Sequence, residues 1–235
     1  MKKSILFILI IISTAVSCKK HEKINTLTNE EEEAGWQLLF NGKSTDNWRM
    51  FKGGQVNGWK IGNGILCNSG VGSDHGGDII TKDTFKNFEL SLEWKIDSAS
   101  NSGIFYHVQE LDSIKAIYES GPEYQLLDDS GFEEELHPDQ YSGANYGMHT
   151  PEGAKVKPLG QWNQTRILVN GAHVEHWLNG VKVVEYEWGG QDWKKRKNKG
   201  KWKDYPYYGT AGQGHIGLQD HGGLTCFRNI KIRKL

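Results

Sequence analysis

Residues 88–96 decide the fold class, and they read Phe-Glu-Leu-Ser-Leu-Glu-Trp-Lys-Ile. Every second residue of this run is large and apolar, from Phe88 to Ile96, and each residue between them is polar. Because side chains of a β-strand point alternately to its two faces, the pattern predicts a strand with one buried face.

The stretch 162–188 predicts a three-stranded antiparallel meander. Its strands are expected at 166–169, 173–178 and 181–188. They are separated by two Asn-Gly pairs, at 170–171 and 179–180, and this pair favours the type I′ turn of tight hairpins.

Shorter strands with turn residues between them fill the rest of the chain. We expect them at 36–40, 65–68, 78–81, 103–108, 123–127, 215–219 and 225–233. No long amphipathic helix, fixed-period repeat or internal linker is evident after Trp36. The fold class is therefore all-β, with two packed antiparallel sheets in one domain over residues 35–235.

Composition narrows the ligand class. The chain has 29 glycines, nine tryptophans and a formal net charge of −1. Aromatic rings and many turns fit a β protein with a sugar site, and the charge argues against a nucleic-acid partner. The basic segment 193–203 is interpreted as a solvated loop, or as a loop from which Trp193, Trp202 or Tyr205 leans over the site.

The N-terminus predicts export. Residues 1–17 combine two lysines, a short apolar run and small residues, which is typical of a signal peptide. Cys18 then resembles a lipidated cysteine, and 18–34 reads as a charged, flexible tether; the alternative is a plain secretory signal. We expect a membrane contact through the lipid only. Lys19-Lys20 favours an outer-membrane lipoprotein that faces the periplasm.

The other cysteines and the cofactor question remain open at this stage. Cys67 and Cys226 can pair in an oxidising compartment or stay as buried thiols. No phosphate loop or dinucleotide motif occurs, so no organic cofactor is expected. No metal ligand is assigned, because the histidines are scattered, although a bound divalent metal is not excluded.

The sharpest candidate site lies in residues 121–129. Glu123 and Gln125 share one strand face, and a bulge after Gln125 would bring Asp128 to that face. Two such carboxylates suit glycoside hydrolysis. The spacing resembles the Glu-x-Asp-x-x-Glu strand of retaining β-glucanases, from which Gln125 and Asp128 depart. The alternative is that Asp128-Asp129 caps a turn.

A second candidate lies in residues 215–222. His215, Gly217, Gln219 and His221 alternate onto one face. Amide and imidazole groups beside a glycine suit sugar hydroxyls, whereas the plainer interpretation is a polar surface strand. Single residues complete the set of substrate-binding candidates: Asn101, His107, His176 and Arg228.

Several of these motifs recur in one family. They are 36–43, 101–104, 121–125, 176–180, 215–222 and 227–230. Taken together, and in this order along the chain, these segments resemble the 3-keto-disaccharide hydrolase domain family over the whole mature domain. The resemblance implies a concanavalin A-like jelly-roll sandwich with a ligand cleft on its concave sheet, and an oligosaccharide or glycoside as the ligand.

The resemblance also implies a chemistry. A ketone at sugar carbon 3 acidifies the hydrogen on carbon 2, so a base can start an elimination that expels the aglycone. Glu123, His221 and Asp128 are the catalytic candidates. Gln219, His221 and Arg228 are candidates for holding the enolate or the hydroxyls.

Three functions follow from these observations. The first is an enzyme that cleaves a glycosidic bond, the second a non-catalytic, lectin-like sugar-binding lipoprotein, and the third a structural partner in an envelope complex. Catalysis requires Glu123, Gln125, Gln219 and His221 to converge in one pocket.

Overall fold

The computed structural model describes residues 23–70, 77–132 and 135–235. The expected signal peptide and Cys18 lie outside these ranges. Within them, no helix has both the length and the apolar character needed to cross a membrane.

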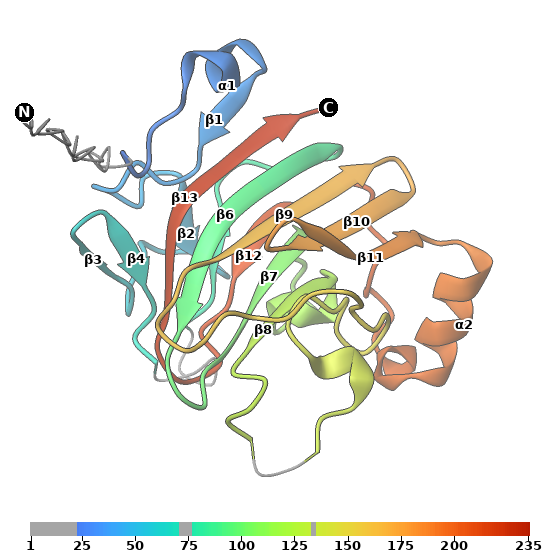
Figure 1. Ribbon diagram of the computed structural model, residues 1–235. Coiled ribbons are helices and arrows are strands. Elements are labelled where there is room, and N and C mark those ends of the chain that lie inside the picture. Colours follow the sequence, from blue (N-terminus) through green and yellow to red (C-terminus); the bar gives the residue numbers. More distant parts are fainter. Residues whose placement is uncertain (1–22, 71–76, 133–134) are drawn as a thin grey trace, which may run out of the picture.

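Two antiparallel sheets are stacked on one another, as the sequence predicts (Figure 1). The large sheet has the order β11 (Val181–Glu187), β10 (His173–Leu178), β9 (Asn163–Asn170), β6 (Phe88–Ile96), β13 (Thr225–Lys234), β4 (Ile65–Cys67) and β3 (Lys60–Gly62), with β1 (Trp36–Leu38) also on β13. The small sheet has the order β2 (Trp48–Met50), β5 (Ile79–Thr81), β12 (His215–Leu218), β7 (Asn101–Val108) and β8 (Glu123–Leu127).

The core lies between the sheets and follows the predicted alternation. Phe88 and Trp94 of β6 are fully buried there, together with Ile104 and Tyr106 of β7. Alternation on β7 turns Phe105 to the other face of the small sheet, where it joins a separate, smaller apolar cluster. The small sheet therefore has an outer face that is partly covered by protein, and this face carries the site.

The two Asn-Gly pairs form different turns. Asn179 (φ +50°) and Gly180 (φ +84°) both have positive φ between paired Leu178 and Val181, so this turn is the expected type I′. In the other hairpin Asn170 still pairs with His173. The loop is then Gly171-Ala172, with positive φ at Gly171 (+63°), which is the pattern of type II′.

The basic segment is helical, which corrects its interpretation as a solvated loop. It forms α2 (Gln191–Lys199) and the 3₁₀ turn η4 (Lys201–Asp204) beside β11. Its two tryptophans, Trp193 and Trp202, are buried, and the ring of each is stacked with that of Tyr208. Seven cations in α2 and η4 obscured this apolar attachment in the sequence pattern.

Part of the expected tether is also folded. Residues 29–33 form α1 (Asn29–Glu33), with a capping box between Thr28 and Glu31. Glu31 forms an ion pair with Lys231 of β13, and Asn25 exchanges hydrogen bonds with Asn229. The chain is therefore attached to the large sheet from about Asn25 onward.

The remaining short elements are the 3₁₀ turns η2 (Ile117–Glu119) and η3 (Pro138–Gln140).

The open question about the cysteines is resolved in favour of pairing. Cys67 of β4 and Cys226 of β13 are register partners and form a disulfide that links residues 159 positions apart.

Candidate functional site

A pocket of about 280 Å³ lies on the outer face of the small sheet. This volume is close to the lower end of the range for small-molecule sites, roughly 300–1,000 Å³. Its walls come from β7, β8, the residues after β12, and the turns η2 and η4. The lining residues are Asn101, Tyr118, Glu123, Gln125, Tyr146, Lys201, Tyr205, Gln219 and His221.

Glu123 is the buried acid of this pocket, with 5% of its surface exposed. Burial raises the pKa of its carboxyl to about 8, because the charged form loses hydration, and the positive charge of Lys201 only partly opposes this. A glycine makes room for the carboxyl. A Cβ at Gly103 would lie 2.3 Å from Glu123 Oε1, so no other residue fits there without displacing the acid.

Gln125 fixes the orientation of Glu123. With its amide turned so that the nitrogen faces acceptors, it donates hydrogen bonds to Glu123 Oε1 (3.0 Å) and to the Ser102 carbonyl (3.2 Å). Strand pairing sets this arrangement, because Gln125 lies opposite Gly103 and Glu123 opposite Phe105. One carboxyl oxygen is therefore held, and the acid has a defined position.

Gln219 provides a polar group from a distant part of the sequence. It is 3% exposed, and its Oε1 has no hydrogen-bond partner among the described residues. Its backbone is tied to β7, since its N–H donates to the Gly103 carbonyl and its own carbonyl accepts from Ser102 Oγ. The structure thus brings together Glu123, Gln125 and Gln219, as predicted, with Asn101 and His221 also lining the pocket.

The sequence pattern did not predict three lining residues, Tyr118, Tyr146 and Lys201, whereas Tyr205 lines the pocket as one interpretation expected. Lys201 puts its ammonium 4.5 Å from the ring centre of Tyr146 and 4.4 Å from that of Trp202. Tyr118 and Tyr205 meet edge to face at 5.9 Å. The sequence feature that could have indicated Lys201 is its position next to Trp202. The many other charges of the basic segment made this feature hard to recognise.

Asp128 does not join the pocket, contrary to the prediction. The pairing of β8 with β7 runs without a register shift to Leu127, so the required bulge is absent from this described strand pair. The Asp128 carboxylate instead accepts hydrogen bonds from the N–H groups of Ala99 (2.9 Å) and Ser130 (3.3 Å). Asp128 therefore caps a turn, which was the alternative interpretation.

Three further candidates are also outside the pocket. His176 is fully buried in the core, bonded to Tyr106 Oη (2.9 Å) and the Gly143 carbonyl (3.0 Å), and burial lowers its pKa to about 3. His107 bonds to the Lys86 carbonyl (2.8 Å). Arg228 lies on the large sheet, where it binds Glu93 (2.5 Å) and covers the ring of Trp162. Each has a structural role that accounts for it.

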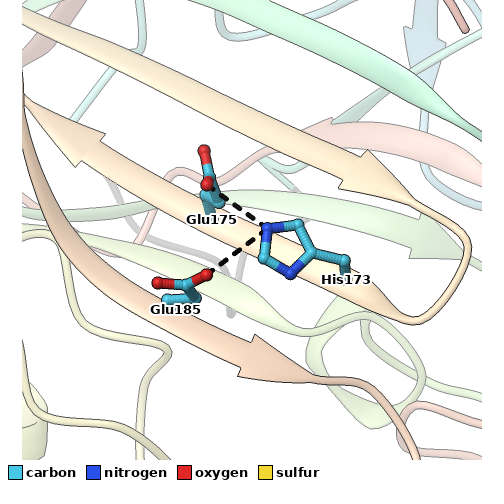
Figure 2. A group of neighbouring side chains, drawn as sticks. All are labelled: His173, Glu175 and Glu185. Carbon is cyan, nitrogen blue, oxygen red and sulfur yellow. Dashed lines mark hydrogen bonds and ion pairs between the residues drawn. The ribbon is translucent and has the colours of Figure 1, made fainter.

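One group in the described residues has metal-ligand geometry, and it is not in the pocket. His173, Glu175 and Glu185 meet on neighbouring strands β10 and β11 of the large sheet (Figure 2). Cations already neutralise the acids: Lys182 pairs with both, and Arg166 lies 3.4 Å from Glu175. The group is best described as a surface ion-pair network.

Comparison with known proteins gives a consistent result. The sequence profile of the 3-keto-alpha-glucoside-1,2-lyase-like domain matches residues 35–233. A 3-keto-disaccharide hydrolase from Bacteroides thetaiotaomicron is 32% identical over an alignment of 248 positions, which covers 92% of this chain and 84% of the relative.

Solved structures agree. A protein from Parabacteroides distasonis, provisionally described as a glycosyl hydrolase, is 43% identical, with a TM-score of 0.86 over 91% of this chain and all of the other. A second protein from that organism is 32% identical, with a TM-score of 0.68 over 85% of this chain and 99% of the other. A carbohydrate-binding module from Bacillus subtilis, 12% identical with a TM-score of 0.50 over 80% of this chain and 96% of the other, shares the fold alone.

Proposed function

Because the chain belongs to the 3-keto-alpha-glucoside-1,2-lyase-like domain family and is a carbohydrate-active enzyme of the hydrolase type, we propose that it cleaves glycosides whose sugar carbon 3 is a ketone. The pocket on the small sheet is the proposed active site, and Glu123 is its base. The observation that carries the proposal is a single buried, oriented carboxyl in a pocket of polar and aromatic groups.

Ordinary glycoside hydrolysis uses two carboxyl groups on opposite sides of the bond, about 5 to 10 Å apart. Glu123 is the only acidic residue among the described residues that line the pocket. A 3-keto sugar removes the need for a second one, because its carbonyl acidifies the hydrogen on carbon 2.

The proposed reaction is an elimination followed by hydration. The Glu123 carboxylate takes the proton from carbon 2, and the electron pair moves onto the oxygen at carbon 3. The enolate then expels the glycosidic oxygen from carbon 1. This oxygen takes the proton from the Glu123 carboxyl and leaves as the alcohol, so Glu123 is again a carboxylate. Water adds across the resulting double bond between carbons 1 and 2, so the overall reaction consumes one water.

The raised pKa of Glu123 supports this role, because a base works best when its pKa is near the working pH. Asn101, Gln219 and His221 offer amide and imidazole groups to the sugar hydroxyls, and the tyrosines offer apolar ring faces. These groups are the proposed binding residues.

We further propose that the protein is an envelope lipoprotein. Residues 1–17 would be removed, and Cys18 would carry the lipid on the periplasmic side of the outer membrane. The disulfide between Cys67 and Cys226 supports an oxidising compartment. Metabolic labelling with a radioactive fatty acid tests this, because the label should be incorporated into wild type and be lost in Cys18→Ser.

The activity is tested with a disaccharide and its 3-oxidised form. We expect purified wild type to cleave only the oxidised form, and in D₂O the product should carry deuterium at carbon 2. Glu123→Gln should reduce the rate about 10²–10⁴-fold, whereas Glu175→Gln on the large sheet should not. Equal cleavage of the unoxidised sugar, or an active Glu123→Gln, would contradict the proposal.

A further inference from the structure

We propose that the ammonium of Lys201 is the cation that holds the negative charge developing on the carbon 3 oxygen, and that Lys201 is a second catalytic residue. This inference rests on the proposed function, because it assigns a role within the same pocket and the same reaction. It depends on where Lys201 lies, on what fixes it and on which protonation state its surroundings favour.

The position of Lys201 matches what the reaction needs. Lys201 and Glu123 line the same pocket from two different elements, η4 and β8. Lys201 is the only lysine or arginine among the described residues that line it. The two charges also interact across the site: Lys201 lowers the pKa of Glu123, and Glu123 raises that of Lys201 against the larger effect of desolvation. A ligand in the pocket would therefore meet one base and one cation.

Aromatic rings fix the Lys201 ammonium, although the side chain as a whole is exposed. The ammonium lies over Tyr146 and Trp202, and the Trp202 Nε1–H donates to the Tyr146 carbonyl (2.9 Å). Trp202 is fully buried and stacks on Tyr208 with ring centres 4.1 Å apart. A lysine is normally a flexible point charge, whereas this one is placed before substrate arrives.

Burial lowers the pKa of Lys201, and the two ring faces act against this effect because they favour the ammonium. A ring face attracts the ammonium and has no comparable attraction for the neutral amine. This argues against an imine mechanism, in which the neutral amine would attack the ketone and release water. The charged form instead stabilises the enolate electrostatically, and a preorganised charge has its largest effect where new negative charge appears.

The test measures kcat and KM for the 3-oxidised disaccharide with Lys201→Met, Lys201→Arg and the control Lys203→Met. Lys203 is exposed, lies on the same 3₁₀ turn and is not a lining residue. We expect Lys201→Met to lower kcat about 10²–10³-fold with KM changed less than about fivefold. Lys201→Arg should recover at least tenfold of that loss, and Lys203→Met should match wild type. Near-ultraviolet circular dichroism of the stacked tryptophans checks that each variant is folded.

The outcomes separate the two proposals. If wild type cleaves the oxidised sugar and Lys201→Met keeps its kcat, this inference fails and the proposed function stands. If wild type does not cleave it, both fail. Sodium cyanoborohydride added during turnover gives an independent readout. A sugar trapped covalently on Lys201, seen by peptide mass spectrometry, would overturn the ammonium role, whereas unmodified Lys201 in an enzyme that turns over supports it.

Discussion

Two glutamates on two faces of the sandwich have opposite environments. On the large sheet, burial tends to raise the pKa of Glu175, but hydrogen bonds from Trp177 and His173 and the charge of Lys182 outweigh it, so the pKa is lowered. In the pocket, burial of Glu123 is the largest effect, the charge of Lys201 only partly opposes it, and the pKa is raised. Compensating partners, rather than burial alone, therefore distinguish a structural acid from a reactive one.

The comparison extends to the sheets themselves. The outer face of the large sheet carries paired charges, such as Glu89 with Arg166 and Arg233, and the disulfide. The outer face of the small sheet carries the pocket. We therefore expect changes on the large sheet to affect stability and changes in the pocket to affect activity.

The largest effect is expected from removing the disulfide. Replacing Cys67 and Cys226 together by serine should lower the free energy of unfolding by roughly 2–5 kcal/mol, since the crosslink closes a long loop. Urea denaturation measures this. Activity at 25 °C should be retained, because neither cysteine lines the pocket. A parallel loss of activity in the folded double variant would break the division between the sheets.

Gly103→Ala should affect activity instead. The added Cβ would lie 2.3 Å from Glu123 Oε1 and 2.8 Å from Phe105 Cε2, so the acid must move. A displacement of about 1 Å typically lowers a rate about 100-fold, and kcat/KM for the oxidised disaccharide measures it. Gly62→Ala in β3 is the matched control, because nothing lies within 4 Å of its added Cβ. Equal activity of both variants would show that Glu123 does not need this position.

The pH profile sharpens the contrast between the two glutamates. A base must be deprotonated, so kcat/KM should rise about tenfold per pH unit and level off near the raised pKa of Glu123, about 8. It should fall again at higher pH, as Lys201 loses its proton. A profile that is flat from pH 5 upward would instead point to a base with a lowered pKa, as Glu175 has. Glu175→Gln should leave the profile unchanged.

The smallest effect is expected at His173. Hydrogen bonds that His173 donates to Glu175 and Glu187 raise its pKa. Its stabilising contribution is therefore complete below its unfolded pKa of about 6.5 and is lost as pH rises through the folded value. His173→Ala should therefore lower stability at pH 5.5 by less than about 1 kcal/mol, as for other surface ion pairs, and have no effect at pH 9. Thermal unfolding at the two pH values measures this, and a larger loss at pH 9 would contradict it.

Local patterns predicted most of the fold because they depend on neighbouring residues. The alternation in β6 and the hairpin at Asn179-Gly180 were correct for that reason. The three-residue strands β2 and β3 were missed, because neither contains the adjacent apolar residues that indicated β4 and β5. The helix α2 was missed because its cations outnumber the one buried tryptophan that attaches it.

The candidate site was predicted in part. That Glu123 and Gln125 share a face follows from the sequence, because strand geometry fixes the direction of every second side chain. Three other features depend on the folded chain: Asp128 turns away, Gln219 joins the pocket from almost a hundred positions further along, and Lys201 also lines it. Those positions depend on strand order and on stacking between distant rings, and no pattern of neighbouring residues encodes either one.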